Sequence, residues 1–497
     1  MRENEPSAVM TSDLLPHGLP STLTLIGGRR LAPEETFPVL DRYTQVKVAD
    51  VAEATRDQVA AAVRTARAAF GLSPAPYDRA RILSRVAELI ETRRDAFVDL
   101  MVTEAGFTRV DALSEIERAL DTLQLSAEEA KRITGEMVPL DGNRGQQDRL
   151  GFTLRTPVGV VCAITPFNSP LNAVLHKIAP ALAAGNAVIL KPSAHTPLTA
   201  SLLCDVFLEA GLPADLLALV HGDAKVGTWL LEEQGIDFYT FTGSTRVGRI
   251  ILAAAGLRRT QLELGSIAST IVCADADLDT AVPKIARASF RKAGQVCTSI
   301  QRLYVERSIV DEVASRLAHA ARAMPAGNPR DPAVRVGPMI SESAAKRAES
   351  WLTEAKQTRA HIEFGGTRTG PVVEPTLLSH VQPGMKVIEE EIFAPVLSTL
   401  PVDTLHEAID SINAMRFGLA AGVFTRNLEQ AFVAARAIKV GAVHINETSS
   451  SRVDGMPYGG VKDSGFGREG PRYAIREMTD EKVITISLGT RPAGRRP

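Results

Sequence analysis

The sequence predicts an α/β fold with more than one domain. Strand-like and helix-like patterns alternate from residue 158 onward, which is typical of parallel strands joined by crossover helices. A second stretch of the same kind begins near Ser266. At 497 residues the chain is too long for one hydrophobic core, so we expect two or three domains.

The N-terminal part is predicted to contain a lead-in, a hairpin and several helices. Residues 1–20 show no regular pattern and are expected to be flexible. Residues 23–31 contain Gly27-Gly28 between apolar runs, which indicates a small hairpin. Apolar residues then recur every three or four positions, which predicts amphipathic helices. These helices cover residues 58–70, 77–105 and 110–133.

An exposed arm is predicted between the helical part and the first sheet. Residues 142–157 are polar at first and then alternate at Leu150, Phe152 and Leu154, which indicates a hairpin. Residues 482–488 alternate as another strand near the end of the chain. Because exposed strands often pair with a second subunit, we expect a homo-oligomer, either a dimer or a tetramer.

The region after the arm alternates strands and helices. It lacks the G-x-G-x-x-G fingerprint of a standard dinucleotide loop and has a strand-to-helix junction at residues 241–248 instead. Free N–H groups at a helix start attract phosphate, although an ordinary capped helix explains this junction equally well. The expected strands are 158–164, 187–190, 217–220 and 238–242, and the expected helices are 171–184, 199–210, 225–234 and 245–255.

The second α/β region carries the candidate nucleophile. A helix is expected over residues 278–293, and Cys297 follows in the polar stretch 294–299. A thiolate is the strongest nucleophile among side chains, and polar neighbours favour its exposure to a substrate. A small buried hydrophobic residue is the competing interpretation. Further elements are expected at residues 301–305, 311–323, 341–358 and 407–413, before a glycine- and serine-rich stretch at 441–470.

Composition argues against several classes of function. Cys162, Cys204 and Cys273 lie in apolar runs, and no CxxC or histidine spacing favours a metal or a disulfide framework. The net charge is −2 with both signs mixed along the chain, so no nucleic-acid partner is expected. Without a membrane-length apolar run or a signal-peptide core, we expect no membrane association and a cytoplasmic location.

Seven motifs in order make the chain resemble the aldehyde dehydrogenase superfamily. The likeness runs from about Thr22 to about Leu488, and the joint order of the motifs is far more specific than any one of them. It implies an NAD(P)-dependent oxidoreductase of the class EC 1.2.1.-. The motifs are 165–170 (TPFNSP), 191–193 (KPS), 241–248 (FTGSTRVG), 262–265 (LELG), 294–298 (GQVCT), 391–395 (EIFAP) and 458–465 (YGGVKDSG).

The resemblance implies a fold and its division into domains. A Rossmann-type cofactor domain is expected over residues 21–137 and 159–265, and an α/β catalytic domain over 266–470. A small β arm for oligomerisation is expected over 138–158 and 471–497.

The resemblance also implies the catalytic residues. Cys297 attacks the aldehyde and forms a thiohemiacetal, whose oxyanion is stabilised by Asn168 and the backbone N–H of Cys297. Glu263 then activates the water that hydrolyses the thioester, although a structural ion-pair role for this carboxylate is an alternative. Lys191 completes the catalytic set. Because relatives that transfer the acyl group to coenzyme A commonly lack this glutamate, hydrolysis is preferred.

NAD or NADP is the cofactor that the resemblance implies. Lys191 is expected near the adenosine ribose and Ser244 near the pyrophosphate. Ala194 replaces a glutamate that is common in NAD-preferring relatives, so a 2′-phosphate on Lys191, Ser193 and Lys225 meets no repulsion and both coenzymes are expected. Ser266-Ile267 is a second departure from the family pattern, which usually has a glycine and a basic residue at these positions, and we have no functional interpretation of it. The complete expected set is Ile164, Thr165, Pro166, Phe167, Lys191, Ser193, Ala194, Lys225, Gly227, Phe241, Gly243, Ser244, Val247, Leu264, Gly265, Glu391 and Phe393.

The substrate is the least constrained part of the prediction. Residues 115–120 and 451–458 look most like the branch that oxidises lactaldehyde and phosphonoacetaldehyde. Arg118 and Arg452 are candidates for binding an anionic tail, and the alternative pairs Arg118 with Glu115 or Glu117 and Arg452 with Asp454. A succinic semialdehyde type, a coenzyme A-acylating enzyme and an inactive relative are the other functions considered. The expected substrate residues are Arg118, Ser169, Val296, Thr298 and Arg452.

Overall fold

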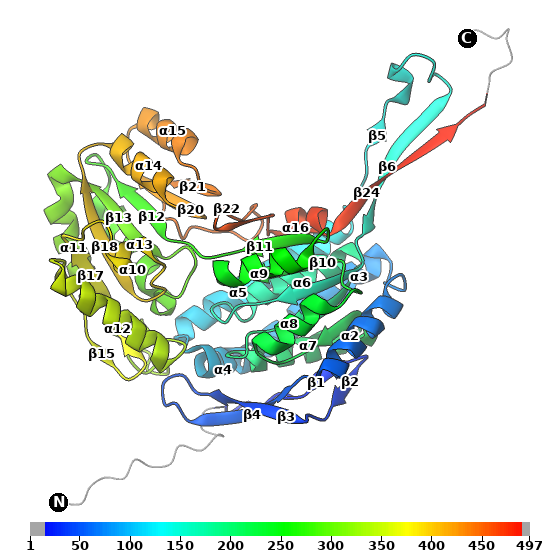
Figure 1. Cartoon of the computed structure of the whole chain (residues 1–497), viewed down its shortest axis with the longest axis horizontal. Helices are drawn as coiled ribbons and strands as arrows, with labels where there is room; N and C mark the ends of the chain where they lie inside the picture. The colour runs from blue at the N-terminus through cyan, green and yellow to red at the C-terminus, as the bar shows by residue number, and fades with distance from the viewer. Residues whose placement is uncertain (1–14, 490–497) are drawn as a thin grey trace, which may run out of the picture.

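Two sheets with parallel central strands form the body of the protein. The computed structural model describes residues 15–489, so residues 1–14 of the predicted lead-in and 490–497 of the predicted C-terminal segment lie outside it. An eight-stranded sheet has the order β2-β1-β9-β8-β7-β10-β11-β23, and a seven-stranded sheet has the order β14-β17-β18-β13-β12-β20-β21. The sheets belong to two lobes with helices packed on them (Figure 1). The α/β prediction is therefore confirmed.

The first sheet follows the predicted alternation closely. Its five central strands run parallel, and each expected strand lies within two residues of the observed one. The predicted hairpin at residues 23–31 is the antiparallel pair β1 and β2. The strands are β1 (Thr24–Ile26), β2 (Arg29–Leu31), β7 (Val160–Ile164), β8 (Ala187–Lys191), β9 (Leu217–Leu219), β10 (Phe238–Thr242), β11 (Arg259–Glu263) and β23 (Gly465–Phe466).

The last strand of this sheet comes from the far end of the chain. β23 pairs antiparallel with β11, so that Gly465 lies opposite Glu263. The segment that contains β23 was predicted to belong wholly to the second unit. Its pairing places the glycine-rich stretch directly beside the end of β11, where Glu263 is located.

One predicted helix is in fact two. The expected helix over residues 77–105 is broken at Arg93, which has φ −106° and ψ 22°. The break lets the second half bury side chains on all sides, while the first half stays amphipathic; neither glycine nor proline marks it in the sequence. The helices around the first sheet are α2 (Arg56–Ala69), α3 (Pro76–Thr92), α4 (Arg94–Ala105), α5 (Arg109–Ala130), α6 (Asn172–Ala184), α7 (Pro197–Glu209), α8 (Ala224–Glu232), α9 (Thr245–Ala255) and α16 (Pro471–Glu477).

The second sheet forms the other lobe. It is parallel apart from the edge strand β14, and its core is separate from that of the first sheet. Its strands are β12 (Ala268–Val272), β13 (Ile300–Glu306), β14 (His361–Phe364), β17 (Thr376–Ser379), β18 (Val396–Val402), β20 (Ala420–Phe424) and β21 (Ala442–Ile445). Its helices are α10 (Leu278–Phe290), α11 (Val310–Arg322), α12 (Glu342–Gln357), α13 (Lys386–Glu389), α14 (Leu405–Ala414) and α15 (Leu428–Ala437).

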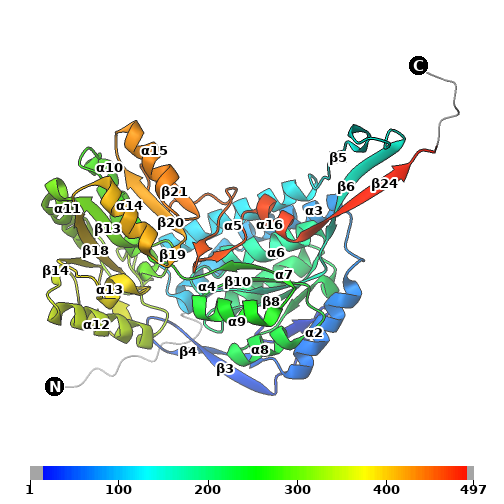
Figure 2. The ribbon, with the colours of Figure 1, turned by 45° about the horizontal axis from the view of Figure 1, so that its top comes forward.

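A three-stranded arm projects from the first lobe. The prediction of a hairpin over residues 142–157 is wrong, because this segment contains only one long strand, β6 (Arg149–Pro157). Its main partner is β24 (Thr479–Ser487), which contains most of the predicted C-terminal strand, and β5 (Met137–Val138) pairs along its other edge. Figures 1 and 2 show the arm extending away from the rest of the chain.

Three short two-stranded sheets complete the strand pairing of residues 15–489. They are β3 (Glu35–Leu40) with β4 (Lys47–Glu53), β15 (Arg368–Thr369) with β16 (Val372–Val373), and β19 (Phe417–Gly418) with β22 (Val461–Lys462).

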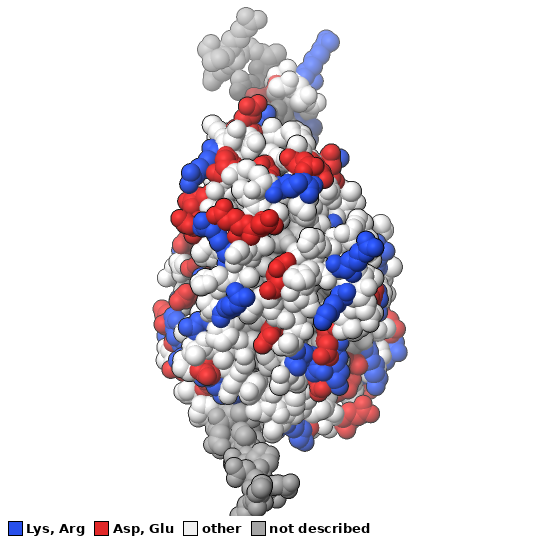
Figure 3. Space-filling view, turned by 90° about the vertical axis from the view of Figure 1, so that its left-hand side faces the viewer, with Lys and Arg blue, Asp and Glu red and all other residues white. Residues whose placement is uncertain are grey.

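The surface carries both signs of charge. Lysine and arginine are interspersed with aspartate and glutamate on the face in Figure 3, which is the outer side of the second lobe. Between residues 15 and 489, no helix is both long and apolar enough to cross a membrane.

Candidate active site

Two cavities meet at Cys297. The larger has a volume of about 780 Å³ and lies over the ends of the first-sheet strands. The smaller, of about 60 Å³, extends toward α5 and α6. Pro166, Asn168, Thr242 and Cys297 line both. A ligand in either cavity can therefore reach the same sulfur from a different side.

A left-handed turn delivers Cys297 to this junction. The predicted helix over residues 278–293 ends earlier, at Phe290. Lys292, Ala293 and Gly294 then have φ values of 51°, 53° and 66°. At Gly294 a Cβ atom would lie 2.1 Å from the carbonyl oxygen of Ala394, so only glycine fits there. The strained turn fixes the direction in which the cysteine loop leaves the helix.

Within residues 15–489, the sulfur of Cys297 has one side-chain hydrogen-bond partner. Its Sγ lies 3.0 Å from the hydroxyl oxygen of Tyr458. Burial, with a smaller contribution from Glu263, raises the pKa of the Cys297 thiol to about 12, and the Tyr458 hydrogen bond acts in the opposite direction. The residue itself stays partly exposed, whereas Cys162, Cys204 and Cys273 are buried.

Asn168, at the start of the 168–172 loop, lines the same two cavities as Cys297. Its side-chain nitrogen Nδ2 donates to the backbone carbonyl of Gln295 at 2.9 Å. Gln295 is buried, and its own side-chain oxygen accepts from the N–H of Ile340 at 3.0 Å. The amide of Asn168 is therefore oriented by a fixed backbone group and keeps its second hydrogen for a ligand.

Glu263 lies at the end of β11 and lines the smaller cavity. Its side chain is buried, and its Oε1 has no hydrogen-bond partner among the described residues. Burial raises the pKa of Glu263 to about 8, with a further contribution from Glu469. A carboxylate in this state can take up a proton near neutral pH, as a general base requires.

Fourteen of the seventeen predicted cofactor residues line the larger cavity. Three residues do not line it: Ile164, which is half-buried at the end of β7; Lys225, which is exposed on α8 with Glu35 at 4.0 Å; and Gly227, which lies next to the Lys191 side chain. The lining residues are Thr165, Pro166, Phe167, Lys191, Ser193, Ala194, Phe241, Gly243, Ser244, Val247, Leu264, Gly265, Glu391 and Phe393.

The groups in this cavity suit a dinucleotide. Ser244 caps α9 by accepting from the N–H of Val247 with its Oγ, and both residues line the cavity at the start of this helix. Burial lowers the pKa of Lys191 to about 8, and no described carboxylate lies within ion-pair distance of its ammonium. Glu391 accepts from the N–H of Ser266 at 3.0 Å, and burial raises its pKa to about 7. A cation and a carboxylate thus face the space for phosphate and ribose hydroxyls.

All five predicted substrate residues line the smaller cavity, but two of them, Arg118 and Arg452, form ion pairs with carboxylates of the protein. Arg118 forms two bonds with Asp454, at 3.0 and 2.7 Å. Arg452 donates to Glu469 at 3.0 Å. The predicted alternative partners, Glu115 or Glu117 for Arg118 and Asp454 for Arg452, are therefore wrong, because the fold brings in carboxylates from distant segments.

Arg291 is a residue of this cavity that sequence reasoning missed. Its guanidinium donates to the hydroxyl of Ser450 at 2.7 Å, and Ser450 Oγ lies 3.1 Å from Thr298 Oγ1. No carboxylate of the described residues lies within ion-pair distance, and Asp111 acts on Arg291 only at longer range. The one feature of the sequence that could have indicated Arg291 is its position six residues before Cys297.

Comparison with known proteins agrees with this geometry. A sequence model described as "Aldehyde dehydrogenase family" matches residues 30–484. The chain is 46% identical over 464 residues to 3-sulfolactaldehyde dehydrogenase from Priestia aryabhattai, covering 93% of this chain and 97% of that protein.

Two solved structures are similar throughout. One is aldehyde dehydrogenase 21 from Physcomitrella patens in complex with the reaction product succinate, at TM-score 0.91 and 34% identity, covering 94% of this chain and 98% of that chain. The other is glyceraldehyde-3-phosphate dehydrogenase from Methanocaldococcus jannaschii complexed with NADP, at TM-score 0.88 and 34% identity, covering 91% and 100%.

Proposed function

The chain belongs to the aldehyde dehydrogenase family, and from that premise we propose that it oxidises a small aldehyde with an anionic tail to its carboxylic acid. The NAD(P)-dependent oxidation of an aldehyde is common to the family. The proposal concerns the substrate, which we infer to be of the lactaldehyde or phosphonoacetaldehyde type. The sulfonate of 3-sulfolactaldehyde, named in a relative, is an anion of the same kind.

Arg291 is the observation that carries this proposal. It is an arginine without a carboxylate partner at the wall of a narrow cavity that ends at Cys297. A guanidinium binds a sulfonate, phosphonate or carboxylate with two parallel hydrogen bonds. Ser450 and Thr298 add hydroxyl groups beside it. Arg118 and Arg452, by contrast, already pair with buried carboxylates.

The residues at the junction account for the chemistry. Cys297 attacks the aldehyde carbon and forms a thiohemiacetal, whose oxyanion receives hydrogen bonds from Asn168 Nδ2 and the Cys297 N–H. NAD(P), when bound, accepts two electrons and the aldehyde hydrogen. Glu263 then removes a proton from the water that attacks the Cys297 thioester, which releases the acid and restores the thiol.

We propose that the enzyme uses either NAD or NADP as the hydride acceptor. Relatives of this chain use NAD or NADP. Ala194 presents no carboxylate at the cavity wall, and the ammonium of Lys191 and hydroxyl of Ser193 line the same cavity. Asp223 also lines this cavity, and the positive charge of Lys191 opposes its effect on a 2′-phosphate.

Succinic semialdehyde is the second candidate substrate. The similar structure with bound succinate comes from an enzyme whose product carries a carboxylate tail, which an arginine at position 291 would also bind. Coenzyme A acylation is less favoured, because Glu263 is present and lines the cavity at Cys297.

A substrate comparison with an Arg291 variant tests the proposal. We expect wild-type kcat/KM for phosphonoacetaldehyde, 3-sulfolactaldehyde or succinic semialdehyde to exceed that for propanal. Arg291→Met is expected to lower kcat/KM at least about tenfold for anionic aldehydes, since hydrogen bonds to charged groups are worth about 1.5–3 kcal/mol. Propanal is the matched neutral control and is expected to be unaffected. Equal losses for both aldehydes would contradict the anion site.

A further inference from the structure

We propose that Tyr458 is a catalytic hydrogen-bond donor that stabilises the thiolate of Cys297. The inference rests on the proposed role of Cys297 as the nucleophile. Tyr458 lies in the loop before β22, far from Cys297 in the sequence. The fold brings its hydroxyl oxygen to 3.0 Å from Sγ.

The direction of this hydrogen bond is fixed once the sulfur is ionised. A thiol and a phenol can each donate to the other, but a thiolate has no hydrogen and can only accept. The bond then joins a neutral donor to a charged acceptor, which makes it stronger than the bond in the thiol state. The contact therefore favours the reactive form of Cys297 over the resting form.

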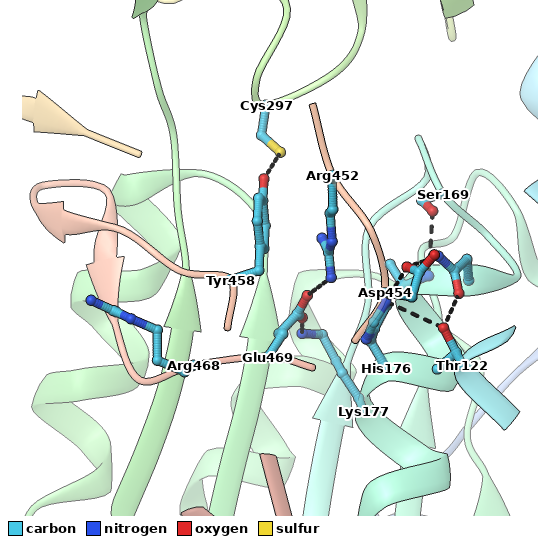
Figure 4. Close-up of polar contacts among 12 residues, drawn as sticks. Thr122, Ser169, His176, Lys177, Cys297, Arg452, Asp454, Tyr458, Arg468 and Glu469 are labelled. Atoms are coloured by element: carbon cyan, nitrogen blue, oxygen red, sulfur yellow. Dashed lines mark hydrogen bonds and ion pairs between the residues drawn. The ribbon is translucent and has the colours of Figure 1, made fainter. Parts of the chain in front are cut away.

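Tyr458 is held in place before any substrate arrives. The guanidinium carbon of Arg452 lies 3.7 Å from the centre of the tyrosine ring. Arg452 donates to Glu469 at 3.0 Å, and the ammonium of Lys177 donates to the other oxygen of Glu469 at 2.8 Å. Figure 4 shows this column of side chains, with the tyrosine hydroxyl directed at the sulfur.

The backbone fixes the same residue a second time. The N–H of Tyr458 donates to the carbonyl of Glu469 at 3.1 Å, and the N–H of Glu469 donates back at 2.7 Å. Tyr458 is thus anchored through both its ring and its main chain. A donor anchored in this way loses no orientational freedom when charge develops on the sulfur. Arg452 is a positioning residue in this arrangement, because it acts through Tyr458.

The other charges around the sulfur make this donor necessary. Burial disfavours the thiolate, and Glu263 and Glu391 add negative potential. Arg452 and Arg291 act in the opposite direction, but neither forms a hydrogen bond with Sγ. Among the described side chains, the hydroxyl of Tyr458 is the group that offsets burial by direct contact.

Protons and electrons balance in the ionisation of Cys297 and its attack on the aldehyde. Ionisation releases the thiol proton from Sγ to solvent water, and Tyr458 keeps its own proton. A sulfur lone pair then forms the C–S bond while the carbonyl π electrons move to oxygen. Because the sulfur loses its negative charge, the Tyr458 bond weakens as the thiohemiacetal forms, so the interaction promotes attack without holding the product.

The test is alkylation of Cys297 by iodoacetamide across pH, with the full-length protein and with the modified site mapped by mass spectrometry. Tyr458→Phe keeps the ring and removes the hydroxyl. We expect its alkylation at a given pH to be about tenfold slower than in wild type, equivalent to about one unit in the thiol pKa. Tyr304→Phe is the matched control, because Tyr304 is also buried and hydrogen-bonded but lines neither cavity.

A second substitution keeps the test decisive if Tyr458→Phe fails to fold. Site-specific replacement of Tyr458 by 3-fluorotyrosine preserves the hydroxyl and makes it a better donor, so alkylation is expected to be faster than in wild type. Unchanged alkylation rates in a folded Tyr458→Phe variant, or slower alkylation with 3-fluorotyrosine, would overturn the role of Tyr458. Aldehyde oxidation that persists in Cys297→Ala would instead refute the nucleophile, which separates failure of the inference from failure of the proposed function.

Discussion

Lys292 and Glu115 form a buried ion pair, with 2.7 Å between Nζ and Oε2, that joins the two loops of the active site. Lys292 also donates to the carbonyl oxygen of Asn168 at 3.2 Å. The other oxygen of Glu115 accepts from the Ser169 hydroxyl at 2.5 Å and from the Asn172 N–H at 2.9 Å. One carboxylate on α5 therefore fixes the loop of Asn168 relative to the turn that leads to Cys297.

Removal of Lys292 is expected to be strongly destabilising. Lys292→Met leaves Glu115 buried and without its cation, and breaking a buried pair in this way costs about 3–5 kcal/mol. Urea unfolding of the purified protein measures the loss. Lys346→Met is the matched control, because its ion pair with Glu342 is exposed and such a pair contributes about 0–1 kcal/mol. Similar small losses in both variants would show that the buried pair does not support the loops.

Glu263 is expected to set the pH dependence of turnover. Its pKa is raised to about 8 by burial, so it is mostly protonated at neutral pH and becomes a base as pH rises through that value. We therefore expect kcat to increase with pH up to about 8 and then level off. The measurement is steady-state kcat at saturating aldehyde between pH 6 and 10.

Loss of the same carboxylate is expected to trap the acyl-enzyme. Glu263→Gln keeps the shape of the side chain but cannot accept the proton of water. One equivalent of reduced coenzyme per active site is expected in a rapid burst, followed by turnover about 10²–10⁴ times slower than in wild type. Stopped-flow absorbance follows both phases. Loss of the burst together with the slow phase would place Glu263 at an earlier step.

The grouping of the proposed catalytic residues around one cavity was largely predictable, because these residues lie in motifs near the ends of strands. Glu263 terminates β11 and Asn168 follows β7, and parallel strands bring such ends to one edge of a sheet. Cys297 was distinguished from the buried cysteines by its polar neighbours. These inferences depend on local sequence and on the general geometry of α/β proteins.

Contacts between distant segments were not predictable. The alternative considered for Arg118 paired it with neighbours on its own helix, yet its partner Asp454 is more than three hundred positions away in the sequence. Tyr458 was part of a recognised motif, but the sequence does not show that its hydroxyl meets Cys297. Arg291 differs from Arg118 and Arg452 in having no carboxylate partner. That difference can be recognised only when the complete fold is known. Side-chain pairing in a buried site is decided by tertiary packing, which leaves no local pattern.

Coenzyme choice is expected to respond to a single residue. Ala194→Glu would introduce a carboxylate at the wall of the larger cavity beside Ser193. Like charges placed together cost several kcal/mol, so kcat/KM with NADP is expected to fall by more than about tenfold relative to NAD. Ala194→Gln is the control for side-chain size, because it adds similar bulk without charge. Equal effects of both variants on the two coenzymes would show that the 2′-phosphate does not approach Ala194.

The arm is expected to form the contact between subunits. β6 and β24 are antiparallel, and their register places Leu150 opposite Ile486 and Leu154 opposite Lys482 on one face. Leu150, Leu154 and Ile486 are 39%, 46% and 42% exposed, which is unusual for large apolar side chains grouped on a projecting sheet. A second copy of the chain is the partner that would cover this face in a closed, symmetric assembly.

Ile486→Glu is expected to dissociate that assembly, because it places a charge within the apolar face at the contact. Light scattering coupled to size-exclusion chromatography would then give the mass of one chain, whereas wild type would give a multiple of it. Thr485→Glu is the matched control: Thr485 is also exposed on β24, but its side chain points to the opposite face of the arm. A wild-type protein that elutes as a single chain, or an Ile486→Glu variant that stays oligomeric, would remove the arm as the subunit contact. Dissociation by both variants would mean that both faces of the arm are covered.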